Sequence, residues 1–599
     1  MRYLSIDFGT VMTKAAIFDT SSNEVTLVRF NDADDAYGYK NNIEYQMPTA
    51  VLYNEEQDTY EVGTKAERSR NYNPDNFHNL FKLQLSENAE NIIPWVVVVF
   101  KEVICRAQKT INPTQHKDIQ FNKIVLTVPS STIEGDCRWN NMMSAIQFAV
   151  QEIEEVDQSV LIPREEMQDI SSFIEIIREP EAAGYTVLKD VISTGQYQDG
   201  DIFLVYDFGG GTFDPALIEY KYGTLRVIGG WDSSIPRGKN IGGIYIDEKI
   251  KEDILQLPSN VVFNEAIEII SKGNYINGHW VLPEGVSKNA WRIANNNLTD
   301  LTELARDAKH TLSNQELSEF RKPQHGEWEY ELSREDYYEM IDPLIDDTIQ
   351  CCTVMLEDYG FSWQDLKAIF LIGGSSKIPL VRQSLERTLS IEEATCTIPS
   401  LENSYDYIHA VAIGAALYEK LKPTKEQFYK FGMLALANEE WIEAEYQFTL
   451  GQSQYGLGLM WYEGFGRKLS YRNAFNYFSS SSEPICVFMQ ALMLFRGQGV
   501  KKDDIAANKL LSTISSLKYG ISLALKNRIS LLQSAINGNI SQVHLNLVYS
   551  NLFYVNLDYQ IGDDLITLTN DAVDIVSKGI EEAKKVTSQW IIKQFFNIL

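Results

Sequence analysis

The sequence predicts an α/β fold of two lobes over residues 1–421, followed by a mainly α-helical repeat domain. Two observations lead to this prediction. A strand–turn–strand segment near the N-terminus is echoed around residue 207 with the same order of strands. After residue 430 the apolar pattern becomes helical and recurs with a small residue in register. A chain of 599 residues is also too long for one hydrophobic core, so several domains are expected.

The internal echo joins YLSIDFGTVMTKAAIFD (3–19) to IFLVYDFGGGTFDPALIEY (202–220). In each segment an apolar strand ends in Asp-Phe-Gly, a short turn carries a threonine, and a second strand returns before a third closes a meander. Three positions match: Asp7 with Asp207, Gly9 with Gly209, and Thr10 with Thr212. The simplest explanation is two lobes of one topology that face each other across a cleft.

Both turns have the chemistry of a phosphate site. Glycine lacks a Cβ, so the backbone N–H groups of such a turn can approach phosphate oxygens closely, and a threonine hydroxyl adds a donor. The carboxylates of Asp7 and Asp207 would repel bare phosphate, but they suit Mg²⁺, which keeps much of its water shell. The alternative for either motif alone is a hairpin with glycine at a left-handed position.

The charge of the chain is uneven and argues against nucleic acid as a partner. The sequence has 53 basic and 82 acidic residues, a net charge of −29. From Pro423 onward the two kinds balance, so the acidic excess lies in residues 1–422. Nucleic-acid binding needs clustered Lys and Arg, whereas backbone amides and a bridging metal can hold a nucleotide.

Cysteine, histidine and hydropathy patterns exclude other classes. The six cysteines form no Cys-x-x-Cys motif and the seven histidines no His-Glu-x-x-His motif, so we expect buried thiols and no transition-metal site. The N-terminus lacks the apolar core of a signal peptide, and the longest apolar run, residues 92–100, is too short to span a membrane. We therefore expect a cytoplasmic protein without a membrane partner.

Residues 1–421 resemble the ATPase domain of the heat-shock 70 kDa chaperone family, which has the actin-like fold. The resemblance is specific because several motifs occur in the family's order. They are IDFGTVMTKAAIF, KIVLTVPSS (123–131), IIREPEAAGY (176–185), YDFGGGTFD, LARDAKHTLS (304–313), FLIGGSSKIPLV (370–381) and AVAIGAAL (410–417).

The resemblance implies ATP or ADP with Mg²⁺ as cofactor, and slow ATP hydrolysis by positioning and charge neutralisation. Asp7 and Asp207 would hold the magnesium through its water shell. The implied nucleotide-binding residues are Asp7, Gly9, Thr10, Val11, Met12, Gly209, Gly210, Gly211, Thr212, Lys309, Ser313, Gly373, Gly374, Ser375 and Lys377. The implied catalytic residues are Lys82, Glu179, Asp207, Thr212 and Asp214.

The departures from the family pattern lie mostly at the base and ribose positions. Val11 replaces a second hydroxyl residue, Arg306 a glutamate and His310 an arginine. Lys377 replaces an adenine-stacking arginine, whose planar group lysine cannot match, and Ile408 stands near a missing aspartate. We expect phosphate binding to be retained and adenine discrimination to be altered.

The C-terminal part departs from the family altogether. Residues 422–429, which include Pro423, are predicted as a linker, and no β-sandwich pattern follows. Residues 430–515 resemble Sel-one-like repeats, relatives of tetratricopeptide arrays. The aligned segments are WIEAEYQF (441–448), YRNAFNYF (471–478) and DIAANKLL (504–511), with Ala444, Ala474 and Ala507 in register. An irregular helical domain without a groove is the alternative.

Residues 516–599 form a C-terminal region without an assigned role. Residues 543–559 alternate partly, as a strand pair would, yet a helix is equally compatible. A closing helix is predicted over residues 571–596.

The sequence as a whole predicts an atypical heat-shock 70-type ATPase whose nucleotide state controls a helical module that binds a protein client, with co-chaperones as further partners. A binding-only scaffold with a degenerate ATPase site is the alternative from another class. A small-molecule kinase of the same fold is a third, although the sequence shows neither a sugar-type pocket nor the corresponding catalytic aspartate.

Overall fold

The chain divides into two units, Met1–Lys422 and Pro423–Leu599, and each is described by itself. The structure is a computed structural model. It describes residues 1–539 except 31–43, 56, 71–75, 86–88, 130–131, 133, 156–160, 163–169, 195–196, 222–223, 231–240, 258–260, 277–278, 282, 322–328, 400–407, 518–520 and 522. The sequence predictions for residues 543–559 and 571–596 lie outside the described residues.

The first sheet of unit 1 has the strand order β3-β2-β1-β8-β9, with β4 paired to β2. The first three strands form an antiparallel meander, and β8 and β9 then continue the sheet in parallel. Its strands are β1 (Arg2–Phe8), β2 (Met12–Asp19), β3 (Glu24–Leu27), β4 (Met47–Pro48), β8 (Lys123–Val128) and β9 (Ile174–Arg178). The inner strands are buried along most of their length, as continuous apolar runs predict.

The second sheet repeats this topology with the order β12-β11-β10-β17. An antiparallel meander is again followed by a parallel strand on the far side of its first strand. The strands are β10 (Asp201–Asp207), β11 (Ala216–Lys221), β12 (Thr224–Gly230) and β17 (Leu366–Ile372). The internal repeat found in the sequence therefore corresponds to a repeated strand order in the two sheets.

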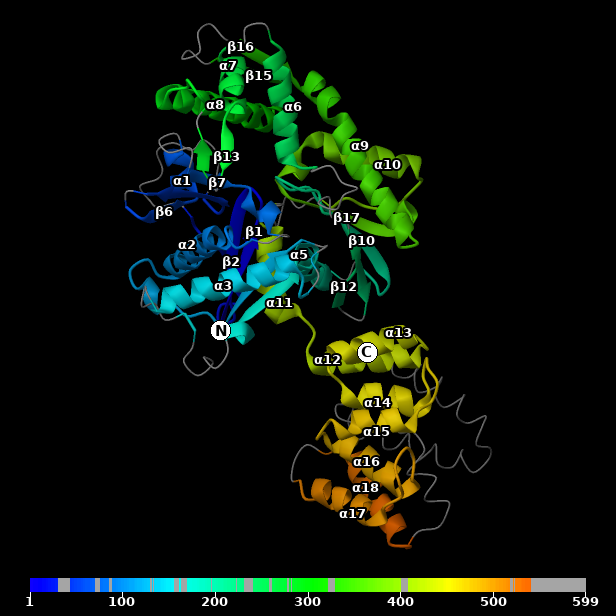
Figure 1. The fold of residues 1–599 in the computed structure, drawn as a ribbon. Coiled ribbons are helices and arrows are strands. Elements are labelled where there is room, and N and C mark those ends of the chain that lie inside the picture. The colour runs from blue at the N-terminus through cyan, green and yellow to red at the C-terminus, as the bar shows by residue number, and fades with distance from the viewer. Residues whose placement is uncertain are drawn as a thin grey trace. The chain divides into compact units, whose positions relative to one another are not determined.

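Two helices, α5 (Glu179–Thr194) and α11 (Ala410–Leu421), lie between the two sheets (Figure 1). They share a buried cluster with Val125 of the first sheet and Val205 of the second. The helices cross closely, because a Cβ on Gly414 would lie 1.6 Å from the carbonyl oxygen of Ala182. This helix pair joins the two halves of unit 1 into one compact body.

The remaining helices cover the outer faces and complete two separate cores. The helices α2 (Ile93–Ile111) and α3 (Cys137–Glu155) pack on the first sheet. The second sheet is covered by α6 (Gly243–Gln256), α8 (Lys288–Leu312), α9 (Arg334–Asp358) and α10 (Pro379–Ile391). Smaller elements are β5 (Ala50–Asn54), β6 (Thr59–Val62), α1 (Thr64–Ser69), β7 (Phe77–Asn79), α4 (Ile170–Phe173), α7 (Val261–Ser271), β13 (Asn274–Ile276), β14 (His279–Val281), β15 (Leu317–Arg321) and β16 (Glu329–Ser333).

Unit 2, as far as it is described, consists of consecutive helices. They are α12 (Lys425–Ala437), α13 (Trp441–Leu450), α14 (Gln454–Glu463), α15 (Tyr471–Ser479), α16 (Pro484–Arg496), α17 (Asp504–Ser515) and α18 (Leu523–Ile536). Helix α12 begins inside the range 422–429 predicted as a linker, because Thr424 and Gln427 form a capping box at its N-terminus. Among the described helices, none combines the length and apolar character needed to cross a bilayer.

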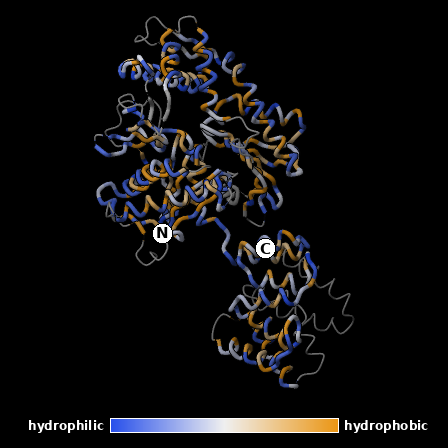
Figure 2. Tube along the Cα trace, in the orientation of Figure 1, coloured by the Kyte–Doolittle hydropathy of each residue, from blue (hydrophilic) through white to orange (hydrophobic). Residues whose placement is uncertain are grey.

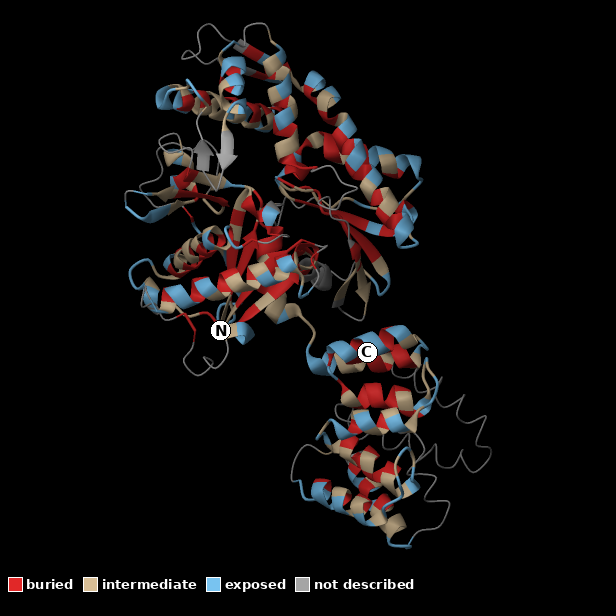
Figure 3. Cartoon of the chain, viewed as in Figure 1, coloured by how far each residue is buried: buried red, intermediate tan, exposed pale blue. Residues whose placement is uncertain are grey.

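Equivalent positions of unit 2 have equivalent environments. The aligned alanines Ala444, Ala474 and Ala507 are fully buried on α13, α15 and α17. Helices α14 and α16 both end at a left-handed glycine, Gly464 with φ 78° and Gly497 with φ 68°. Buried and exposed residues alternate along most of these helices (Figure 3), and hydrophobic residues are interspersed with hydrophilic ones in the same way (Figure 2).

Candidate functional site

The first turn of the candidate site joins β1 to β2. Asp7 lies near the end of β1, and Gly9 begins the turn. A Cβ on Gly9 would lie 2.1 Å from the carbonyl oxygen of Met12, so this close backbone approach requires glycine. The turn is fixed further by Thr49, whose amide donates to the Val11 carbonyl at 2.8 Å.

The second turn joins β10 to β11 and is held by its own backbone. Asp207 is the last residue of β10, and its carbonyl accepts a hydrogen bond from the Asp214 amide at 2.9 Å. The Gly209 amide donates to the Thr212 carbonyl at 3.0 Å. The Thr212 hydroxyl donates to Asp214 Oδ2 at 2.5 Å, which orients the buried carboxylate of Asp214. Pro215 comes directly before β11, where no ladder amide is required.

The two turns lie against each other. A Cβ on Gly211 would be 2.6 Å from the Thr10 side chain, and one on Gly210 would be 2.8 Å from Val11. In the described part of the chain, the amides of Thr10, Gly210 and Gly211 donate to no other backbone group. The β1–β2 and β10–β11 turns, which are far apart in the sequence, therefore lie together in the structure. Both contain glycines, and both present backbone amides that could donate to a ligand.

Lys82 and Glu179 form a buried ion pair beside these turns. Lys82 lies in the short 3₁₀ helix η3 (Phe81–Gln84), and Glu179 is the first residue of α5. The Lys82 Nζ–Glu179 Oε1 distance is 2.8 Å, and the side chains are 10% and 9% exposed. The structure therefore pairs two of the residues that the resemblance implied as catalytic.

The carboxylate of Asp207 is strongly affected by its surroundings. Burial, together with the negative charges of Glu179 and Asp7, raises the pKa of Asp207 to about 7, and the cations Lys14 and Lys82 only partly oppose this shift. A buried carboxylate near other carboxylates takes up a proton or a cation readily. Asp207 is thus a group whose negative charge a bound cation would stabilise.

Lys14 is a residue of this site that the sequence reasoning missed. It lies on β2 directly opposite Asp7, and its Nζ is 2.9 Å from Asp7 Oδ2. Burial lowers the pKa of Lys14, but Asp7, with smaller contributions from Asp207 and Glu179, outweighs that effect and raises it overall. The available signal was a single lysine within the otherwise mostly apolar strand MTKAAIFD.

The loop after β17 reaches the second turn. Gly373 has φ 83°, and a Cβ there would lie 2.7 Å from Asp207 Oδ1. The Ser375 hydroxyl donates to the Gly209 carbonyl at 2.8 Å. Gly374 and Lys377 lie in the same short 3₁₀ helix, η7 (Gly374–Lys377). The loop predicted to bind the nucleoside and the turn predicted to bind phosphate are therefore neighbours.

A cluster on α6 and α8 lies beside this loop. The Lys309 ammonium donates to the Gly243 carbonyl at 2.8 Å and lies 2.5 Å from Asp247 Oδ1. Arg306 Nε lies 3.8 Å from Asp247 Oδ2, so two cations share one buried carboxylate. Burial lowers the pKa of Lys309. Asp247 carries no sequence motif and was missed, and Ser313 directs its hydroxyl to the Lys309 carbonyl of its own helix.

The chemistry of these residues fits a nucleotide with Mg²⁺. Amides and hydroxyls of the two turns are phosphate donors, and carboxylates from two equivalent strands suit a hydrated hard cation. Within the described ranges, no three His, Cys, Asp or Glu side chains converge to ligate a metal directly. Asp7 and Asp207 are the carboxylates that would hold a hydrated magnesium ion.

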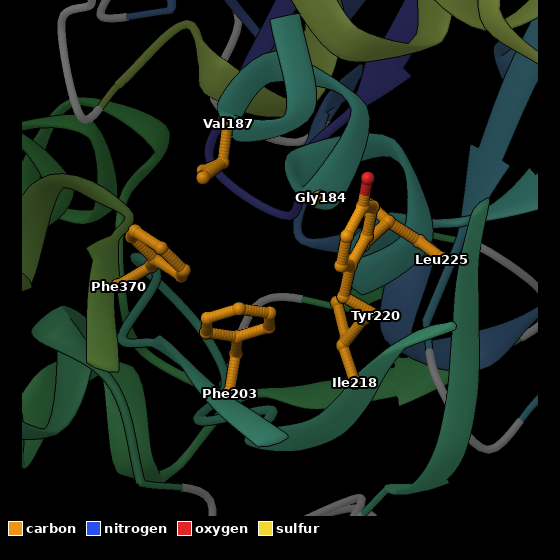
Figure 4. Close-up of a pocket in the computed structure, with 7 residues that line it drawn as sticks. All are labelled: Gly184, Val187, Phe203, Ile218, Tyr220, Leu225 and Phe370. Carbon is orange, nitrogen blue, oxygen red and sulfur yellow. The ribbon is translucent and has the colours of Figure 1, made fainter. Parts of the chain in front are cut away.

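A separate apolar pocket lies between α5 and the second sheet (Figure 4). Phe203 and Phe370 come from β10 and β17, Ile218 comes from β11, and Gly184 and Val187 face them from α5. No charged side chain lines this pocket, so it does not suit a phosphate.

The fold and the site define a two-lobed α/β unit in which paired turns meet. Residues 285–433 match the family model described as Hsp70 protein. The match begins after the β1–β2 and β10–β11 turns and ends within α12, and it implies an actin-like ATPase fold for unit 1.

Curated relatives support an Hsp70-type ATPase domain. A "Chaperone protein HscA homolog" of Azotobacter vinelandii is 25% identical over 246 residues, which are 41% of this chain and 31% of the relative. The "Mitochondrial-type heat shock protein 70" of Encephalitozoon hellem is 26% identical over 251 residues, 41% and 35% of the two chains. The matched part thus spans about a third of these relatives' length.

Proposed function

We propose that the protein is an atypical Hsp70-type ATPase in which the nucleotide state of unit 1 controls the binding of a protein client by the helices of unit 2. It would work in the cytoplasm with co-chaperones. Proteins of the Hsp70 family bind ATP or ADP, usually with Mg²⁺, which supplies a reason to test these ligands first.

One observation carries the proposal: two turns with the same strand order lie in contact and assemble Asp7, Asp207, Lys82 and Glu179 around one point. Paired hairpins with a purely structural role would not need a buried Asp207 whose pKa is raised by burial and by two neighbouring carboxylates, since such burial costs stability.

Different residues would bind the phosphates, hold the magnesium ion and activate the attacking water. The amides of Thr10, Gly210 and Gly211 would bind phosphate oxygens, and Asp7 and Asp207 would hold hydrated magnesium, which neutralises phosphate charge. Lys82, fixed by Glu179, would orient the terminal phosphate and the attacking water. Asp214, oriented by Thr212, would accept the proton of that water.

Binding of ATP tests the first part. The full chain should bind a fluorescent ATP analogue saturably in the presence of Mg²⁺, and unlabelled ATP should compete. A folded chain that shows no saturable binding would refute the proposal.

A binding-only scaffold is the second candidate, and the cluster of Arg306 and Lys309 on Asp247 favours it. Arg306 stands where the heat-shock 70 pattern has a glutamate, so the ribose end of the proposed site would be altered. Single-turnover hydrolysis by the wild type and by Lys82→Ala separates the candidates, provided that both bind nucleotide. A wild-type rate well above the variant supports an ATPase; equal background rates support the scaffold.

The role of unit 2 rests on exposed apolar side chains at equivalent positions. Ile442 on α13 and Ile505 on α17 precede the aligned alanines by two residues and are 85% and 86% exposed. We assign this Sel-one-like module, residues 430–515, to client binding. Affinity capture with the full chain in ATP and in ADP tests the assignment. Partners should depend on the nucleotide and be lost with Ile442→Glu; capture indifferent to both would contradict it.

A further inference from the structure

Lys14 places a fixed positive charge inside the candidate nucleotide site. It is the cross-strand partner of Asp7, and its side chain is only 15% exposed. Cross-strand partners in an antiparallel pair have adjacent Cβ atoms on the same face, so the strand register itself sets this ion pair. A buried ammonium is costly unless several acceptors satisfy it.

The carboxylates near Lys14 come from three different elements. Asp7 lies on β1, Asp207 on β10 and Glu179 on α5, and all three act on the Lys14 ammonium electrostatically. Lys14 therefore faces the interior of the site rather than an isolated partner. A structural role alone would require only the single contact with Asp7.

The second turn contains no such cation at the equivalent place. Continuing the register of β10 and β11 places Asp214 opposite Asp207, and their backbones are joined by the 2.9 Å hydrogen bond between them. Thr10 touches Gly211, so phosphate oxygens bound by the amides of both turns would lie close to the first turn. Lys14 is the residue of β2 that would supply positive charge to these phosphate oxygens.

We propose that Lys14 is a phosphate-binding residue that exchanges Asp7 for the phosphate chain when nucleotide binds, so that the protein retains nucleotide without a divalent ion. This inference rests on the proposed nucleotide binding. An ammonium and a hydrated divalent ion would share the neutralisation of the phosphate charge, and the loss of one would make the other more important.

Calorimetric titration of the full chain with ADP, in EDTA and in Mg²⁺, tests the inference. A charge-assisted hydrogen bond corresponds to an affinity change of about ten- to a hundredfold. Lys14→Met should weaken ADP binding by about that factor in EDTA and by clearly less in Mg²⁺. Lys123→Met is the matched control, because Lys123 is also a strand lysine paired with carboxylates, at the start of β8 and beside the start of β1. The control should bind like the wild type.

If Lys14→Met does not fold, a second pair of variants tests whether Lys14 binds phosphate. In EDTA, Asp7→Asn should bind ADP at least as tightly as the wild type, since it frees the ammonium and removes a repelling carboxylate. Asp7→Asn/Lys14→Met should lose this affinity, and it buries no unpaired charge at this position. Equal affinities of these two variants in EDTA would overturn the inference.

The outcomes separate the two claims. No ADP binding by the folded wild type in either buffer would refute the proposed function. Binding in Mg²⁺ that vanishes in EDTA, or an equal effect of Lys14→Met in both buffers, would overturn only the role of Lys14.

Discussion

The two turns of unit 1 share their strand order but differ in the partner of their first aspartate. Opposite Asp7 stands Lys14, whereas Asp214 stands opposite Asp207. The first turn therefore contributes a neutralised carboxylate, and the second contributes two carboxylates, one of which has its pKa raised to about 7. Two turns of the same topology can thus give one site a cationic side and an acidic side. The proposed ligand would use both, because its phosphates are negative and its magnesium ion is positive.

The largest expected effect on stability comes from Lys82, which like Lys14 is a buried cation of the site. Lys82→Met would leave Glu179 buried without a partner, and the free energy of unfolding should fall by about 3–5 kcal/mol. Lys82→Met/Glu179→Gln should recover most of this loss. Urea unfolding measures both. Lys272→Met is a control, because the pair of Lys272 with Glu268 is exposed to solvent and should contribute little to stability. Equal losses for the two single variants would contradict the burial argument.

The next effect compares the equivalent glycines of the turns. A Cβ on Gly9 would meet the Met12 carbonyl at 2.1 Å, whereas one on Gly209 would lie 3.3 Å from the Thr212 carbonyl. Gly9→Ala should therefore cost about 1–3 kcal/mol of stability through overpacking against backbone. Gly209→Ala should cost about 0.5 kcal/mol or less. Thermal unfolding compares them, and a larger loss for Gly209→Ala would reverse the expected order.

The raised pKa of Asp207 predicts a pH dependence. The proposed magnesium binding would require the carboxylate of Asp207, and below a pKa of about 7 a proton would compete for it. The magnesium-dependent gain in nucleotide affinity should therefore grow by about tenfold between pH 6 and pH 8. Titrations at both pH values check this. Asp207→Asn is the control for the titration of the phosphates themselves, and a pH dependence that survives in it would assign the effect elsewhere.

The smallest expected effect concerns Pro215, which precedes β11 beside Asp214. Pro215→Val adds an amide at the edge of the turn without disturbing a ladder bond. Stability and ADP affinity should both stay within about 0.5 kcal/mol of the wild type. A larger change in affinity with unchanged stability would show that the proline orients Asp214.

Much of unit 1 could be predicted because its strands are apolar runs that end in glycine turns, as in β1 and β10. The internal repeat predicted two lobes that face each other, and the structure adds the contact between Thr10 and Gly211. Lys14 and Asp247 could not be predicted, because their roles depend on register and on the packing of α6 against α8. No local spacing marks such partners.

In unit 2 the glycines that end α14 and α16, Gly464 and Gly497, are predictable in principle, because left-handed helix ends favour glycine. The start of α12 at Lys425 is also predictable in principle, since Thr424 and Gln427 have the spacing of a capping box. Pro423 instead suggested a linker here, although it lies just before the N-cap residue and does not interrupt the helix.

The most direct test of a nucleotide site between the two turns is the titration of the full chain with a fluorescent ATP analogue in Mg²⁺, for the wild type and for Gly211→Val. A Cβ at Gly211 would press on Thr10 and separate the two turns. If nucleotide is held between the turns, the wild type should bind saturably, and binding should be lost in a Gly211→Val chain that still unfolds cooperatively. Equal binding by both proteins would contradict a nucleotide held between the turns.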